Sequence, residues 1–141
     1  MSNNKVMRIV LDTNSLIQCV AYNSVYRSVW NSVLTGRNSL CVSNEILFEY
    51  EEILSRFFSP TFADTVINAL MESNHVELIH PTYRFNLITA DPDDNKFVDC
   101  AIQANARYIV TNDRHYDVLR QIDFPKVGIV RLTDFLLMMH G

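Results

Sequence analysis

Short apolar segments alternate with longer segments of helical periodicity along this chain. The first apolar segment, Val6 to Leu11, is interrupted only by Arg8 and is typical of a strand buried on both faces of a parallel sheet. Polar turn and helix-cap residues follow it at Asp12, Thr13 and Asn14. Four further strands are predicted at Ser39 to Val42, Val76 to Ile79, Arg107 to Val110 and Val127 to Leu132.

Apolar residues three and four positions apart predict helices between these strands. The clearest stripe starts at Ile46 and Leu47 and ends at Phe57 and Phe58, all of which we expect to face the core. Pro60 ends that helix and opens the next one. The remaining helical segments are predicted at Tyr26 to Leu34, Asp91 to Ile102, Tyr116 to Gln121, and from a cap at Thr133 or Asp134 to Met139. We expect His80 to Ala90 to be a loop.

This alternation predicts an α/β fold in which residues 1–141 form one domain. Right-handed crossovers between parallel strands give a doubly wound five-stranded parallel sheet with helices on both faces. In such sheets ligands bind outside the carboxyl ends of the strands, at the point where the strand order reverses. Candidate functional residues are therefore expected directly after strands.

Composition narrows the function classes. The chain has 141 residues and a formal net charge of −4, so binding of nucleic acid by phosphate neutralisation alone is disfavoured. Cys19, Cys41 and Cys100 form no pair with metal-ligand spacing, which favours buried reduced thiols. No signal peptide or membrane span is recognisable in the sequence. We therefore expect a cytoplasmic protein without membrane contact.

Three aspartates are placed by these elements where they could carry chemistry. Asp12 follows the first strand directly and Asp113 follows the fourth. Asp94 precedes Phe97 by three residues and Val98 by four, so it lies on the inward face of its helix. Each of the three could also be a helix cap, because aspartate is a preferred cap residue.

The helix that begins near Ile46 carries two further candidates. Glu49 and Glu51 flank its apolar stripe on opposite sides, and periodicity does not choose between them. Carboxylates that meet at one sheet edge repel one another unless a hard divalent cation binds between them. Oxygen ligands favour Mg²⁺ or Mn²⁺, which promote phosphodiester hydrolysis. Nearby Thr13, Asn14, Thr111 and Asn112 could orient ligands or waters.

Four stretches together resemble PIN-domain nucleases, and in particular the toxin components of prokaryotic toxin–antitoxin pairs. Each motif is short, but together they occur in the expected order over most of the chain. The matching stretches are Ile9 to Asn14, Glu49 to Leu54, Asp91 to Phe97 and Tyr108 to Asp113. The resemblance implies that the first and fourth strands are neighbours. It also implies a metal-dependent endoribonuclease that cleaves single-stranded RNA, with an antitoxin protein as partner and a homodimer as its oligomeric state.

The resemblance also assigns roles to individual residues. Asp12, Glu49, Asp94 and Asp113 match the metal-binding and catalytic positions of the family, which prefers Glu49 to Glu51. Asp99 matches a position that is sometimes acidic and would support these ligands indirectly. Two basic residues beside the motif acids, Lys96 and Arg114, are candidates for contacts with RNA phosphates, and His115 is a weaker candidate for a substrate contact.

Two other classes of function compete with the nuclease. A non-catalytic module could bind RNA or a protein through the same fold, and it would lack a saturable metal site at the acids. A phosphatase or receiver domain also carries an aspartate after its first strand. Both fit poorly, because Asn14 stands where such a phosphatase needs a second aspartate, and Arg131 and Thr133 stand near the position where a receiver needs lysine.

Overall fold

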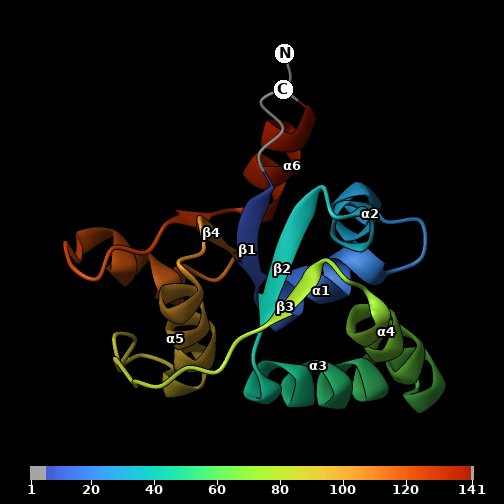
Figure 1. Ribbon diagram of the computed structural model, residues 1–141, viewed down its shortest axis with the longest axis horizontal. Coiled ribbons are helices and arrows are strands. Elements are labelled where there is room, and N and C mark those ends of the chain that lie inside the picture. Colours follow the sequence, from blue (N-terminus) through green and yellow to red (C-terminus); the bar gives the residue numbers. More distant parts are fainter. Residues whose placement is uncertain (1–5, 141) are drawn as a thin grey trace.

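A parallel sheet of five strands forms the centre of the protein in a computed structural model, which describes residues 6–140 (Figure 1). The strand order is β3-β2-β1-β4-β5, and every neighbouring pair is parallel. The strands are β1 (Met7–Leu11), β2 (Asn38–Val42), β3 (Val76–Leu78), β4 (Tyr108–Val110) and β5 (Ile129–Val130). The predicted doubly wound sheet and the predicted pairing of the first and fourth strands are confirmed.

Helices cover both faces of this sheet. In Figure 1, α5 lies on one side of β1 and β2, whereas α1 and α2 lie on the other side. Helices α3 and α4 pack against each other next to α1. The helical segments are α1 (Thr13–Val20), α2 (Arg27–Thr35), α3 (Asn44–Phe57), α4 (Pro60–Glu72), η1 (Pro92–Asp94), α5 (Asn95–Ala104), η2 (Arg114–Gln121) and α6 (Leu132–His140), with η1 and η2 in 3₁₀ conformation.

Apolar side chains of the central strands form the core. Ile9, Val10 and Leu11 of β1 are fully buried, and all five residues of β2 are buried. Burial on both faces explains why these strands are nearly continuous apolar runs. The hydroxyl of Tyr50, on α3, donates a hydrogen bond to the Leu11 carbonyl oxygen at 2.5 Å. This contact attaches α3 to the end of β1, where the candidate chemistry lies.

Helix α1 is an element that the sequence interpretation did not assign. It is only eight residues long and is buried on most of its surface, including Thr13 and Ser15. Its exposed positions are Asn14 and, in part, Gln18, so its polar face amounts to one residue per turn. A helix of about two turns is too short for this pattern to be recognised in the sequence. The cap interpretation of Asp12 agrees with the structure, since the Asp12 side chain accepts a hydrogen bond from the Ser15 backbone N–H at 2.8 Å.

The predicted start of the last helix is wrong. Helix α6 begins at Leu132, so Thr133 and Asp134 lie in its first turn and do not cap it. The Leu132 N–H donates to Oδ1 of Asn112 at 3.0 Å, which satisfies one of the free amides at the start of the helix. Because α6 already begins at Leu132, β5 ends at Val130, two residues before the end predicted from the sequence.

The apolar stripe of α3 also ends earlier than predicted. Ile46, Tyr50 and Leu54 are buried, but the Phe57 side chain is 67% exposed and Phe58 is also exposed.

The three cysteines are buried and free, in agreement with the prediction of buried thiols. Within the described residues, none of the helices has the length and apolar character needed to cross a membrane.

Candidate active site

A cavity of about 240 Å³ lies at the carboxyl ends of β1 and β4. We call it the acidic cavity, because six carboxylate side chains line it. The four acids predicted from the sequence are all among its lining residues. These residues are Asp12, Thr13, Asn14, Glu49, Ile53, Asp91, Asp93, Asp94, Phe97 and Asp113.

Asp12 lies at the base of this site. Leu11 pairs with Val110 in the sheet, so the residues after these two strands lie side by side. The Asp12 side chain is held at both oxygens, because Oδ1 accepts from the Ser15 N–H and Oδ2 accepts from the Thr111 hydroxyl. Burial raises the pKa of Asp12 above its ordinary value, and the charge of Asp113 adds to the effect, while the hydrogen bonds from Thr111 and Ser15 oppose it.

Asp113 is positioned by its own backbone and by Arg131. Its N–H donates to the Thr111 hydroxyl oxygen at 3.0 Å, so Thr111 connects it to Asp12. Oδ1 of Asp113 accepts from the His115 N–H at 2.8 Å and caps η2. The Arg131 guanidinium contacts the Asp113 carbonyl oxygen at 3.3 Å and both oxygens of Asp117 at 2.9 Å. These contacts fix the loop that presents the Asp113 carboxylate.

Glu49 reaches the cavity from α3. Its Oε2 accepts a hydrogen bond from the Thr13 hydroxyl, and its Oε1 lies 2.7 Å from Nζ of Lys96. Glu51, which periodicity left as an alternative, is exposed and is not among the cavity-lining residues. The ammonium group of Lys96 also contacts the Asp93 carbonyl oxygen at 2.8 Å. Lys96 therefore forms an ion pair with Glu49, which lines the cavity, and is held in place by the backbone of Asp93.

Asp94 is the least stabilised of the four carboxylates. Its Oδ2 atom is buried and has no hydrogen-bond partner among the described residues. Burial raises the pKa of Asp94 to about 6, and the charges of Asp91 and Asp113 contribute to the increase, while the buried Tyr116 hydroxyl opposes it. A buried carboxylate oxygen whose neighbouring donor, the Tyr116 hydroxyl, lies outside normal hydrogen-bond geometry is poorly stabilised by the protein alone. A bound cation would supply the missing positive partner.

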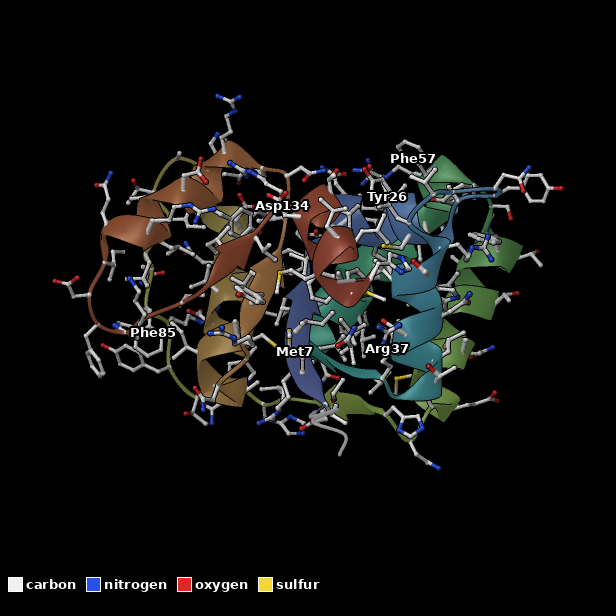
Figure 2. All side chains as sticks on the ribbon, turned by 90° about the horizontal axis from the view of Figure 1, so that it is seen from above. Met7, Tyr26, Arg37, Phe57, Phe85 and Asp134 are labelled. Carbon is white, nitrogen blue, oxygen red and sulfur yellow. The ribbon has the colours of Figure 1, made fainter. Side chains whose placement is uncertain are left out.

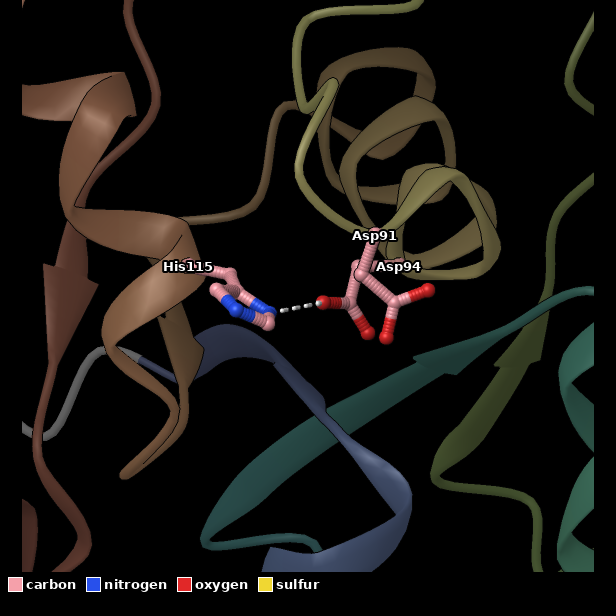
Figure 3. A group of neighbouring side chains, drawn as sticks. All are labelled: Asp91, Asp94 and His115. Atoms are coloured by element: carbon pink, nitrogen blue, oxygen red, sulfur yellow. Dashed lines mark ion pairs between the residues drawn. The ribbon is translucent and has the colours of Figure 1, made fainter.

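One compact group of possible metal ligands lies at this cavity. Ligand atoms of Asp91, Asp94 and His115 all lie within 4.8 Å of one another, and Figure 3 shows the three side chains converging from η1 and η2. Nδ1 of His115 is 3.8 Å from Oδ2 of Asp94 and 3.4 Å from Oδ1 of Asp113. Sequence reasoning treated Asp91 only as a helix start and His115 only as a weak substrate contact.

Of the other residues predicted to support the site, some lie at the acidic cavity and others lie away from it. Asn14 lines the cavity, Thr111 orients Asp12, and Asn112 accepts from the Leu132 N–H. Asp99 is not among the lining residues, and its Oδ1 accepts instead from the Phe85 N–H at 3.1 Å. It therefore holds the loop before η1. Arg114 is exposed beside Asp113.

Sequence reasoning missed two supporting contacts. The Tyr50 hydroxyl bond to β1 was hidden because Tyr50 lies in an apolar stripe, where an aromatic residue is expected to be core. Arg131 was considered only as evidence against a receiver domain. Its position after the fifth strand was the available signal, since residues at that place lie at the same sheet edge as Asp12.

This arrangement fits a hard divalent cation. The donor atoms are carboxylate oxygens supported by hydroxyl groups, and one buried oxygen is unpaired. Mg²⁺ and Mn²⁺ prefer such oxygen ligands. The acids come from four separate segments of the chain, so only the fold brings them together.

Comparison with known proteins shows the family. The sequence model of the PIN domain matches residues 8–115, which is well over half of the chain. No curated protein sequence matches the chain. Several solved structures share its fold, and two of them have 15% sequence identity to this chain.

The first is the crystal structure of VapBC2 from Rickettsia felis bound to a DNA fragment from the promoter, with a TM-score of 0.63 over 89% of this chain and 98% of that chain. The second is VapC20 from Mycobacterium tuberculosis, described as a toxin that cleaves the sarcin-ricin loop, with a TM-score of 0.55 over 74% and 89% of the two chains. The family match over residues 8–115, together with the parallel sheet and the acids at its carboxyl edge, shows that this chain belongs to the PIN domain family.

Proposed function

We propose that this protein is an endoribonuclease that hydrolyses phosphodiester bonds of single-stranded RNA and depends on Mg²⁺ or Mn²⁺. The observation that carries the proposal is that Asp12, Glu49, Asp94 and Asp113 line one cavity at the sheet edge. The unpaired buried oxygen of Asp94 supports a cation at this cavity. VapC20, which shares the fold, is described as a loop-cleaving toxin, and this also supports a cleaving enzyme.

We assign the four acids to holding the cation, which when bound supplies an acidified water and neutralises charge on a phosphate oxygen. Thr111 positions Asp12 and Asp113 through its hydroxyl group. Thr13 orients Glu49 in the same way. These hydroxyl groups fix the carboxylates before substrate arrives, which lowers the cost of organising the site.

Two basic residues are assigned to the RNA backbone in this proposal. The Lys96 ammonium group is paired with Glu49, which lines the cavity, and Arg114 is exposed next to Asp113. Contacts of this kind position a strand without reading its sequence. With a net charge of −4, the protein needs such local cations, and a bound metal ion, to approach a polyanion.

The proposal includes a biological setting. We propose that the protein is the toxin component of a toxin–antitoxin pair, with an antitoxin protein as partner and a homodimer as its assembly. The similarity in fold to a structure solved as VapBC2 supports a partner protein. The three free, buried cysteines fit a reducing compartment, so we propose that it acts in the cytoplasm.

Cleavage of RNA in the presence and absence of divalent cations tests this function. We expect purified protein to cut a labelled single-stranded RNA with Mn²⁺ or Mg²⁺, and EDTA to stop the reaction, because the acids cannot promote hydrolysis without a cation. Gel analysis of the products gives the rate, and phosphatase treatment tests for a 5′-phosphate. If the protein neither cuts RNA nor binds Mn²⁺ saturably, the non-catalytic binding module is the better account.

A further inference from the structure

A second cavity, of about 380 Å³, adjoins the acidic cavity on the side of α1. The two cavities share three lining residues, Asp12, Asn14 and Asp113. A nucleic acid strand with a phosphodiester at the acids would therefore place a neighbouring nucleotide at the second cavity. The occupant of this cavity can be inferred from the side chains that are unique to it.

These side chains are one aromatic, one aliphatic and two carboxamides. Ile17 and Gln18 come from α1, Phe57 from the end of α3, and Asn112 from the segment after β4. With the shared Asn14, three carboxamides line the cavity. No lysine, arginine or histidine occurs among the described residues that line it. A phosphate group therefore has no direct positive partner here, whereas an uncharged planar base finds both an apolar face and hydrogen-bonding groups.

Phe57 has the position and support that a stacking residue needs. It is 67% exposed even though it follows the apolar stripe of α3, and Figure 2 shows it at the edge of the molecule, pointing away from the core. Its ring lies 5.7 Å from the ring of Phe58, which lies 4.8 Å from that of Phe62. This aromatic row restricts the movement of the Phe57 ring from one side and leaves the rest of it accessible.

The Asn112 carboxamide is also oriented. Its Oδ1 accepts from the Leu132 N–H at 3.0 Å, which identifies the oxygen end of the group. Nδ2 is then the end that remains for a ligand. A fixed donor beside an aromatic face can bond an acceptor on the edge of a stacked base.

From these features we propose that the second cavity is a nucleobase subsite, in which Phe57 stacks on the base beside the cleaved phosphodiester and the carboxamides contact the base edge. The subsite rests on the proposed ribonuclease function and names how its substrate is held. Stacking on an aromatic ring tolerates every base, so Phe57 contributes affinity and the carboxamides contribute preference. Because the subsite contacts the base, it acts on RNA binding more than on the chemical step.

Cleavage kinetics of Phe57 variants test this subsite. With a single-stranded RNA and Mn²⁺, we expect Phe57→Ala to raise the half-saturating RNA concentration about tenfold and to leave the maximal rate within about twofold. Phe57→Trp should restore binding, since it keeps an aromatic face. Phe48→Ala is the matched control, because Phe48 is on the same helix, is 72% exposed and is not among the residues that line either cavity.

A binding measurement separates this proposal from the ribonuclease function. The same RNA with 2-aminopurine at successive positions is titrated with Ca²⁺ in place of Mn²⁺, which keeps a hard cation at the acids, and we expect one position to be quenched by wild type and Phe57→Trp but not by Phe57→Ala. Quenching that depends on Phe57 without cleavage by wild type would overturn only the ribonuclease proposal. Cleavage by wild type, with Phe57→Ala and Phe48→Ala behaving alike in both assays, would overturn the base subsite.

Discussion

Asp12→Asn is expected to lower the rate of RNA cleavage by a factor of about 1,000 or more, because it removes a charged ligand from the centre of the site. Asn keeps the size of the side chain, and its carbonyl oxygen can still accept from the Ser15 N–H and cap α1. The hydrogen bond from Thr111 to Oδ2 is lost, but a buried negative charge is removed as well. The fold should therefore survive, which thermal unfolding of the variant checks, and single-turnover cleavage with Mn²⁺ measures the rate.

A pair of glutamate variants provides the control for this experiment. Glu49→Gln should also lose most activity, since Glu49 lines the acidic cavity. Glu51→Gln should cleave at the wild-type rate, because Glu51 is on the same helix but is exposed and does not line the cavity. Cleavage by Asp12→Asn at the wild-type rate would show that the activity comes from other residues or from a contaminating nuclease.

Asp94→Asn is expected to stabilise the protein at neutral pH in the absence of divalent cations. Burial and neighbouring carboxylates raise the pKa of Asp94 from 3.8 to about 6, so the folded protein disfavours the ionised form. Well below pH 4 the group is protonated in both folded and unfolded states and does not affect stability. The cost develops as the pH rises from about 4 to about 6 and is complete above that range.

The difference between these two pKa values corresponds to at most about 3 kcal/mol in the free energy of unfolding. Urea unfolding of wild type and Asp94→Asn in EDTA at pH 4 and pH 7 measures it, and the gain in stability of the variant should be much larger at pH 7 than at pH 4. Asp64→Asn, at an exposed position on α4, is the control and should change stability little at either pH. Equal stability of wild type and Asp94→Asn at pH 7 would contradict the raised pKa of the Asp94 carboxyl.

Divalent cations should offset most of this difference in stability between wild type and Asp94→Asn. Mn²⁺ binds the ionised carboxylates, so wild type should gain about 2.7 kcal/mol when the ion concentration is 100 times the dissociation constant. Asp94→Asn should gain much less. Removing the Asp94 charge is expected to stabilise the metal-free fold, because the carboxylates at this cavity repel one another and are kept together for function.

The strands and the longer helices were predictable because their burial pattern is regular. Val6 to Leu11 and the α3 stripe from Ile46 to Leu54 follow the periods of a buried strand and an amphipathic helix. Helix α1 was not predicted, since its eight residues make only about two turns and give too short a periodic signal. The exposure of Phe57 escaped prediction because Phe57 fits the apolar period of α3 but is the last residue of the helix, where burial depends on tertiary packing.

The positions of the acids were predictable, but their partners were not. Strand ends and helical spacing place Asp12, Asp94 and Asp113 at one edge of the sheet. The ion pair between Glu49 and Lys96 joins residues 47 positions apart, and nothing local in the sequence predicts it. The approach of His115 to Asp94 likewise depends on how η1 and η2 pack.

An anomalous difference map from crystals soaked in Mn²⁺ tests most directly whether the acids share a cation. We predict a peak inside the acidic cavity, bound by carboxylate oxygens of Asp12, Asp94 and Asp113, with Glu49 turned from Lys96 or bridged through water. The same map from Asp12→Asn crystals should show the peak weakened or lost. A peak confined to Asp91 and His115 at the rim, or no peak at saturating Mn²⁺, would contradict the shared metal site.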